Sequence, residues 1–278
     1  MESKYSIYFV ATPIGNLEDM TLRAINVLKN VDVIACEDTR DSMKLLNHFE
    51  IKNKLISYHK FNEEKRSEEI IEKAKEGVTF AIITDQGMPG ISDPGHILIK
   101  RCQENNISYT VLPGASSIIT ALVASGLAND RFSYYGFVPK KAKNIEILMK
   151  ELEKEEKTSI LLDTPYKLKN TISYMKKYFP KRKLSIAREL TKLYEEIKTF
   201  TIEDITDDVI TLKGEFVLIL EGAQITKKDS LDNYKDEIKE ELENGSSTKD
   251  IVKSIRKKTD FSKNEIYNYV LEIQNKNL

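Results

Sequence analysis

Three short segments rich in Gly, Pro and small polar residues contain the residue types of this chain that are best suited to bind a ligand. Residues 12–17 read TPIGNL, residues 84–95 read TDQGMPGISDPG, and residues 112–117 read LPGASS. Each segment follows an apolar, β-rich run. In open parallel sheets, ligands bind beyond the carboxyl ends of the strands, where backbone N–H and C=O groups are free. We therefore interpret the three segments as the loops of one binding site.

The second segment is far longer than a strand-to-helix turn requires, which favours a binding role. Asp85 stands at the carboxyl end of a strand, where a carboxylate suits a ribose hydroxyl or an ammonium group. Gly87 and Gly90 would present backbone groups to the ligand, and the apolar Met88 and Ile91 could form the wall of an adenine site.

The first and third segments also have ordinary structural interpretations. Pro13 fixes the backbone and Gly15 permits a positive φ or a close ligand approach, but a simple β–α turn would use the same residues. Ser116 and Ser117 open a predicted helix, whose N-terminus could hold a carboxylate. Either serine could instead cap its own helix.

Other residues with chemical potential favour structural roles. Asp93 followed by Pro94 predicts a helix N-cap with proline at the first helical position. The histidines His48, His59 and His96 form no pair at metal-ligand spacing, and His59 is the best functional candidate among them. The chain has no GxGxxG after its first strand and no GxxxxGK[ST], and the LPGASS serines lack a GxSxG elbow. These absences argue against a dinucleotide fold, a P-loop and hydrolase chemistry.

Alternating strand and helix signals position these loops in an α/β domain at residues 1–126, built around a mostly parallel sheet. Strands are predicted at 5–11, 31–35, 78–84 and 108–112, and helices at 19–30, 62–75, 93–105 and 115–126.

A second α/β domain is predicted at residues 127–224, and a C-terminal helical appendage at 225–278. The second domain has predicted strands at 132–138, 158–162, 183–188 and 215–221 and helices at 145–156 and 166–178; the appendage has helices at 231–243, 248–257 and 263–274. Ser262 and either Ser247 or Thr248 are the predicted N-caps of the last two helices. The appendage could contact RNA or could support packing or dimerisation.

Composition places the chain among globular proteins, with 278 residues of which 40% are hydrophobic and 31% charged. No apolar run approaches the roughly 18 residues of a membrane span, and no signal peptide is recognisable, so a cytoplasmic protein is expected. Cys36 and Cys102 lie far apart in apolar stretches and are predicted to be buried free thiols.

The charge is balanced overall but not locally. The net charge is −1, whereas residues 165–198 hold ten Lys or Arg against three Glu, and Lys140, Lys141 and Lys143 form a second basic cluster. Such clusters contact RNA phosphates in some proteins and are solvated helix faces in others.

Seven segments, in this order, resemble the tetrapyrrole methylase family, which has the class III fold of S-adenosylmethionine-dependent methyltransferases. Within that family they are most similar to the bacterial small-subunit ribosomal RNA (cytidine-2'-O-)-methyltransferases. The segments are FVATPIGNLEDMTLRAINVLKNVDVIACEDTR, LISYHKFNE, TDQGMPGISDPG, PGASS, RFSYYGFVPKK, RELTKLYEE and KGEFVLILEG.

The resemblance implies two α/β domains with the cofactor in the cleft between them, and usually a homodimer. It also implies S-adenosylmethionine as cofactor, no required metal, and a cytidine 2'-hydroxyl in the decoding region of small-subunit ribosomal RNA as methyl acceptor. The residues expected to bind the cofactor are Pro13, Gly15, Asp85, Gly87, Gly90, Ile91, Ser116 and Ser117.

A ribose hydroxyl is a poor nucleophile, so a base or a cation near the acceptor would assist its attack on the activated methyl group. We assign Arg188, Glu189 and Lys192 to this catalytic role, with a surface salt bridge as the alternative for Glu189 and Lys192. The residues expected to bind the acceptor are Asn16, Glu37, Asp38, Arg40 and His59.

Three positions depart from the pattern of the family. Gln86 replaces a small residue, Met88 replaces a threonine, and Tyr166 stands where a histidine is expected. Two other functions fit the same fold: methylation of a tetrapyrrole or a protein, and a cofactor-binding ribosome-assembly module without catalysis.

Overall fold

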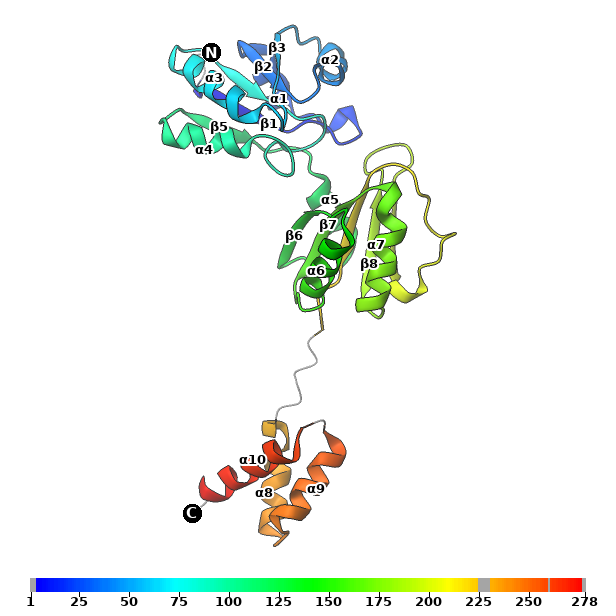
Figure 1. Cartoon of the computed structure of the whole chain (residues 1–278). Coiled ribbons are helices and arrows are strands. Elements are labelled where there is room, and N and C mark those ends of the chain that lie inside the picture. Colours follow the sequence, from blue (N-terminus) through cyan, green and yellow to red (C-terminus); the bar gives the residue numbers. More distant parts are fainter. Residues whose placement is uncertain (1–3, 225–230, 260, 277–278) are drawn as a thin grey trace. The chain divides into compact units, whose positions relative to one another are not determined.

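The computed structural model of the protein describes residues 4–224, 231–259 and 261–276, and the chain divides into two compact units, Met1–Ala223 and Gln224–Leu278 (Figure 1). The first unit contains two five-stranded sheets. The predicted boundary near residue 126 lies between these sheets and stays a prediction. Among the described residues, no helix has the length and apolar character that a membrane span requires.

The first sheet is entirely parallel, with the order β3-β2-β4-β1-β5. Its strands are β1 (Ile7–Val10), β2 (Val33–Cys36), β3 (Lys54–Ser57), β4 (Phe80–Ile82) and β5 (Tyr109–Leu112). The connecting helices are η1 (Leu17–Asp19), α1 (Leu22–Asn30), α2 (Thr39–His48), α3 (Glu63–Lys75) and α4 (His96–Glu104).

Both faces of this sheet are buried, which explains why its central strands are continuously apolar. Tyr8 and Val10 pack on one face with residues of α1 and α2. Ile7 and Phe9 pack on the other face with residues of α3 and α4. Cys36 and Cys102 are buried free thiols, which confirms their predicted state.

The second sheet is mixed, with the order β6-β7-β10-β8-β9, because β10 runs antiparallel to both of its neighbours. Its strands are β6 (Phe132–Phe137), β7 (Thr158–Asp163), β8 (Lys183–Arg188), β9 (Glu196–Thr201) and β10 (Phe216–Leu220). The helices of this region are α5 (Ser117–Ala124), α6 (Ala142–Leu152), α7 (Pro165–Tyr178) and η2 (Ile202–Asp204).

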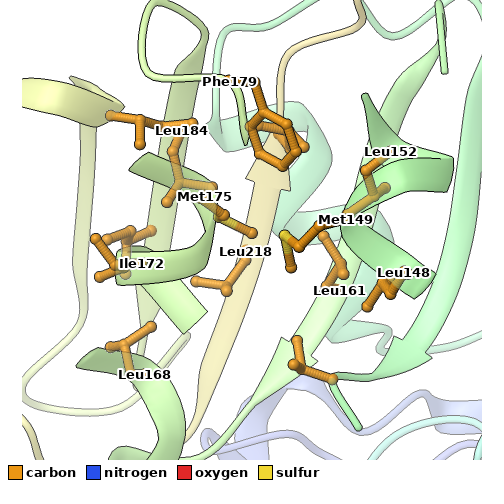
Figure 2. Close-up of a cluster of buried hydrophobic side chains, with 14 of the residues drawn as sticks. Leu148, Met149, Leu152, Leu161, Leu168, Ile172, Met175, Phe179, Leu184 and Leu218 are labelled. Carbon is orange, nitrogen blue, oxygen red and sulfur yellow. The ribbon is translucent and has the colours of Figure 1, made fainter. Parts of the chain in front are cut away.

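Helices lie on both faces of the second sheet. Figure 2 shows Met149 of α6 and Met175 of α7 packed with Leu161 and Leu218 of the sheet. On the opposite face, residues of α5 pack with alternate strand residues such as Ile160. Helix α5 therefore follows the last strand of the first sheet and covers a face of the second.

The C-terminal unit consists of η3 (Leu231–Tyr234), α8 (Lys235–Glu243), α9 (Thr248–Lys258) and α10 (Lys263–Lys276), packed around their own apolar core. Ser247 caps α9 by accepting a hydrogen bond from the N–H of Asp250. Ser262 accepts a bond from the N–H of Glu265, whose carboxylate accepts one from the N–H of Ser262. Both predicted caps are confirmed.

The α/β class, the two sheets and the helical C-terminal segment confirm the predicted fold class. Helix α2 and strands β3 and β9 were not predicted. The prediction that Asp93 caps a helix is wrong, because α4 begins at His96 with Gly95 as its N-cap. The carbonyl of Pro94 instead accepts a bond from the N–H of Gly90, so the loop closes on itself before the helix starts.

Candidate functional site

The three predicted loops meet at one edge of the first sheet because they follow the neighbouring strands β4, β1 and β5. Thr12 and Gly87 form an antiparallel bridge, with N–H to carbonyl distances of 2.9 and 3.1 Å. Gly114 lies against Ala11, where a side chain at position 114 would collide with the Ala11 Cβ. The close approach of Gly114 to the Ala11 side chain thus requires glycine at this position.

A cavity of about 520 Å³ lies where these loops face the second sheet. The predicted site residues that line it are Glu37, Asp85, Gly87, Ile91, Ser116 and Ser117. Residues from the second sheet and its loops, including Tyr134, Phe137, Asp163 and Glu215, complete the lining. We call this cavity the cleft.

The long loop after β4 is held from both sides. Gly87 and Gly90 adopt positive φ angles of 76° and 86°, which glycine tolerates without strain. The N–H of Gly95 donates a 2.8 Å hydrogen bond to the Glu63 carboxylate. On the other side, the hydroxyls of Ser92 and Tyr134 lie 2.6 Å apart, so the loop is bonded directly to the second sheet.

The third loop presents the start of α5 to the cleft. The Ser116 hydroxyl accepts a 3.5 Å bond from the N–H of Ile119, which confirms the alternative that this serine caps its own helix. Ser117 is the first residue of α5 and also lines the cleft.

Carboxyl groups dominate the electrostatics of the cleft. Burial, together with the charges of Glu37 and Asp85, raises the pKa of Asp93 to about 6. Burial and the charge of Asp85 also raise the pKa of Glu37. Burial raises the pKa of Asp85, although the Asp38 N–H donates a hydrogen bond to it. Within the described part of the chain, no three His, Cys, Asp or Glu residues are grouped so as to hold a metal ion.

The predicted catalytic residues lie beside the cleft, Arg188 at the end of β8 and Glu189 and Lys192 in the loop that follows it. The Lys192 ammonium lies 3.1 Å from the Glu189 carboxylate and 2.8 Å from the Glu215 carboxylate. Partial burial raises the pKa of Glu189, but the N–H of Glu215 and the Lys192 ammonium hold it below its ordinary value. Arg188 is paired with Glu196 at 3.2 Å.

Pro13 and Gly15 lie outside the cleft lining. They line a second cavity of about 270 Å³, which shares Asp85 and Gln86 with the cleft. Gly15 also packs under the loop of the predicted catalytic residues, since a Cβ at position 15 would lie 2.8 Å from the carbonyl oxygen of Leu190. Gly15 therefore allows two loops to touch.

Four predicted acceptor-binding residues line neither cavity. Asn16 caps the short helix η1, and Asp38 caps α2 while pairing with the exposed Arg40 at 3.1 Å. His59 bonds to the side chain of Asn62 at 3.3 Å. Glu37 is the member of the predicted acceptor-binding set that reaches the cleft.

Several cleft residues were missed by the sequence analysis. Asp163 and Thr164 line the cleft at the end of β7, and Tyr134 and Phe137 line it from β6. The sequence did contain a signal, because these residues lie in or directly after predicted strands, as the Gly-rich loops do. Tyr166, one of the departures, is 98% exposed.

Most of the ten basic residues between 165 and 198 are bonded to other groups of the protein. Arg182, for example, is buried and donates to the carbonyls of Leu152 and Glu221. Seven more form ion pairs or bond to carbonyls: Lys167, Lys169, Lys176, Lys181, Arg188, Lys192 and Lys198. Lys140, Lys141 and Lys143, in contrast, are exposed and form no ion pair with any described residue.

Comparisons with solved structures show the same fold. Uroporphyrin-III-C-methyltransferase from Thermus thermophilus is 20% identical, with a TM-score of 0.57 over 77% of this chain and 93% of that one. Diphthine synthase is 13% identical, with a TM-score of 0.61 over 78% of this chain and 90% of that one.

Sequence relatives are much closer. A protein named Ribosomal RNA small subunit methyltransferase I from Synechocystis sp. is 39% identical over 275 residues, 96% of this chain and 98% of the relative. Proteins of the same name from Halalkalibacterium halodurans and Bacillus subtilis are 45% and 38% identical, covering 80% and 94% of this chain and 77% and 92% of the relatives. The model of the tetrapyrrole (corrin/porphyrin) methylases matches residues 6–206. The chain therefore belongs to the tetrapyrrole methylase family.

Proposed function

We propose that this protein transfers a methyl group from S-adenosylmethionine to the 2'-hydroxyl of a cytidine in the decoding region of small-subunit ribosomal RNA. The observation that carries the proposal is the near-full-length similarity to relatives named as small-subunit ribosomal RNA methyltransferases. The cleft described above supports it.

The residues of the cleft fit S-adenosylmethionine. The volume of the cleft, about 520 Å³, lies within the roughly 300–1,000 Å³ that small-molecule binding sites have. The carboxyl groups of Glu37 and Asp85 suit a ligand that carries a sulfonium and an ammonium cation. The apolar Met88 and Ile91 line the same cleft and suit the adenine.

The start of α5 completes this assignment. Ser117 lies in the first turn of the helix, where free N–H groups favour the carboxylate of the cofactor.

Of the residues that depart from the family pattern, Gln86 has a defined partner, because its amide donates a 3.0 Å bond to Glu215. Gly87, which lines the cleft, and Gly90, which lies outside its lining, both adopt positive φ angles, so the backbone turns beside Gln86 and Met88 are formed with these departures present.

When bound, S-adenosylmethionine supplies a methyl group that its sulfonium has already activated. The task of the protein is therefore to position the acceptor hydroxyl and to manage its proton. The smaller cavity lined by Pro13, Gly15 and Lys44 meets the cleft at Asp85, and we assign it to the acceptor nucleotide. A nucleotide there would reach the cleft beside Asp85.

The contacts of Glu189 and Lys192 favour a positioning role over direct proton transfer. Glu189 is bonded to the Glu215 N–H and to Lys192, which makes it a weak proton acceptor. We assign both residues to positioning: they hold the loop that packs over Gly15, which itself lines the acceptor cavity.

RNA binding fits the exposed lysines Lys140, Lys141 and Lys143, which follow the cleft residue Phe137. A homodimer fits the exposed apolar side chains of the edge strand β5 and of α5, including Val111, Ile119 and Val123. A ribosomal substrate supports the expectation that the protein is cytoplasmic.

Transfer of a labelled methyl group tests the proposal. Small-subunit particles lacking this modification are incubated with labelled S-adenosylmethionine, and the methylated nucleotide is mapped. The proposal expects one 2'-O-methylcytidine in the decoding region. Parallel reactions with a tetrapyrrole and with an elongation-factor protein serve as controls, and label in either of them but not in RNA would refute it.

A further inference from the structure

Few ionisable side chains in the cleft are available to accept a proton. The Asp163 carboxylate accepts a 2.6 Å bond from Thr171 and pairs with Lys167 at 3.2 Å. The Glu215 carboxylate bonds to Lys192 and Gln86. These two carboxylates are therefore committed to partners within the protein.

The remaining carboxylates are those of Asp85, Glu37 and Asp93. Asp85 is exposed and accepts a 3.2 Å bond from the N–H of Asp38. The side chains of Glu37 and Asp93 accept no hydrogen bond and form no ion pair with any residue of the described ranges. Two carboxylates in the cleft are thus free to bind a proton.

Asp93 is the better fixed of the two. Its neighbour Ser92 is bonded to Tyr134 of β6, and Gly95 is bonded to Glu63 at the start of α3. The hydroxyl of Tyr58 also donates to Glu63, at 3.2 Å. The residues on both sides of Asp93 are therefore held in place, Ser92 by β6 of the second sheet and Gly95 by the start of α3.

The surroundings of Asp93 favour uptake of a proton. The ionisable groups that face it are Glu37 after β2, Asp85 after β4 and Tyr134 on β6, and none of them is a cation. Burial and the two carboxylates raise the pKa of Asp93 to about 6, close to the value at which a general base is effective near neutral pH.

We propose that Asp93 is the catalytic base that accepts the proton of the acceptor hydroxyl during methyl transfer. The inference rests on the proposed function. The hydroxyl oxygen forms a bond to the methyl carbon while the methyl–sulfur bond breaks and leaves its electron pair on sulfur. The O–H bond breaks, its proton passes to a carboxylate oxygen of Asp93, and the proton then leaves to water.

Asp93→Asn tests the assignment, because it keeps the shape of the side chain and removes its basicity. Single-turnover rates at saturating S-adenosylmethionine and RNA are measured from pH 5 to 9, and the affinity for S-adenosylmethionine is measured separately by calorimetry. Asp93→Glu is the conservative variant, and Glu37→Gln tests the other free carboxylate. Asp130→Asn is the control, since Asp130 is exposed and lies outside the cleft lining.

The expected result is a rate lowered roughly 100-fold or more in Asp93→Asn, with an affinity for S-adenosylmethionine within about threefold of the wild type. The wild-type rate should rise with pH through one ionisation at or below pH 6, and Asp93→Asn should lose that rise. Asp93→Glu should recover part of the rate and the pH dependence.

Three results would overturn the assignment: an unchanged rate in Asp93→Asn, a loss confined to cofactor affinity, or loss of the pH dependence in Glu37→Gln alone. If Asp93→Asn does not fold, Asp93→Ser and Asp93→Glu give the same comparison. A wild-type protein that methylates no RNA would refute the proposed function itself and is thereby distinguished from failure of this inference.

Discussion

The side-chain amide of Gln86 donates a 3.0 Å hydrogen bond to the carboxylate of Glu215. Gln86 belongs to the loop after β4 of the first sheet, and Glu215 directly precedes β10 of the second. Together with the bond between Ser92 and Tyr134, this contact ties one loop to the second sheet at two points along the cleft. The width of the cleft is thus fixed partly by side-chain hydrogen bonds.

Gln86→Ala should weaken cofactor binding about fivefold, since an exposed hydrogen bond to a charged group contributes on the order of 1 kcal/mol. Calorimetric titration with S-adenosylmethionine measures the change. Gln103→Ala is a matched control, because Gln103 also donates from its amide, at 2.9 Å to Tyr109, outside the cleft lining. Equal affinities of both variants for S-adenosylmethionine would show that the Gln86–Glu215 bond does not contribute to cofactor binding.

Lys192→Ala should lower the methyl-transfer rate about tenfold or more, because it releases Glu189 and Glu215 and loosens the loop over Gly15. The loss should fall on both kcat and the KM for RNA, as expected for positioning. Lys198→Ala removes a lysine paired with Glu196 and is the control. Normal RNA methylation by Lys192→Ala would exclude any role for this lysine in the reaction.

Gly15→Ala should cost about 2 kcal/mol of stability and most of the activity, since the added methyl would collide with the loop of Lys192 and Leu190. Gly77→Ala is the control, because it introduces backbone strain without a collision. Gly77 has a φ of +92° and open space around it, so its substitution should lower stability by about 1 kcal/mol and leave activity intact. Urea unfolding and methyl-transfer rates give both quantities. Equal activity of the two variants would contradict the proposed packing role.

Replacing Lys140, Lys141 and Lys143 with glutamine should weaken RNA binding and make it less dependent on salt. If each lysine neutralises one phosphate, the slope of log affinity against log salt should fall by about 2–3. A control triple variant of Lys169, Lys181 and Lys198 changes the net charge equally, but these lysines are paired with carboxylates. If the salt dependence falls further in the control variant, the RNA binds to the basic segment at residues 165–198 instead.

The sequence predicted the three loops as one site because the alternation of strands and helices places their strands in one parallel sheet. It could not assign Asp93, since Asp-Pro before a helix is also the pattern of an N-cap. The choice depends on the bond between Gly90 and Pro94, which shifts the helix start to His96. Such a bond between loop residues leaves no periodic signal in the sequence.

The same limit applies to charge. A count of Lys and Arg made residues 165–198 the stronger basic segment. Their pairing with Glu and Asp depends on how the chain folds, as for Lys181, which lies before β8 and pairs with Glu203 of η2. Likewise, β9 is an edge strand with half-exposed residues, and its sequence lacks the continuous apolar run of β10. Patterns along the chain predicted the buried strands better than the edges.

Asp93→Asn should stabilise the cofactor-free protein at neutral pH. The pKa of Asp93 is about 6 in the folded protein against 3.8 for the ordinary group, so the unfolded chain loses this proton first as pH rises. The contribution of Asp93 to stability is therefore complete below about pH 4 and is lost as pH rises through 6. Asparagine does not titrate, so the variant should match the wild type near pH 4 and exceed it at pH 7, by about 1–2 kcal/mol after allowance for solvent screening.

Asp32→Asn provides a control of opposite sign. Hydrogen bonds from the N–H and hydroxyl of Thr79 hold the pKa of Asp32 below its ordinary value, so its stabilising effect is present above that value and is lost as pH falls. Asp32→Asn should therefore destabilise the protein at pH 7. Chemical denaturation at pH 4, 5.5 and 7 measures both variants. A stability of Asp93→Asn that runs parallel to the wild type across this range would show that the Asp93 carboxyl ionises normally, and a carboxyl that ionises normally would be a weaker base for the acceptor hydroxyl.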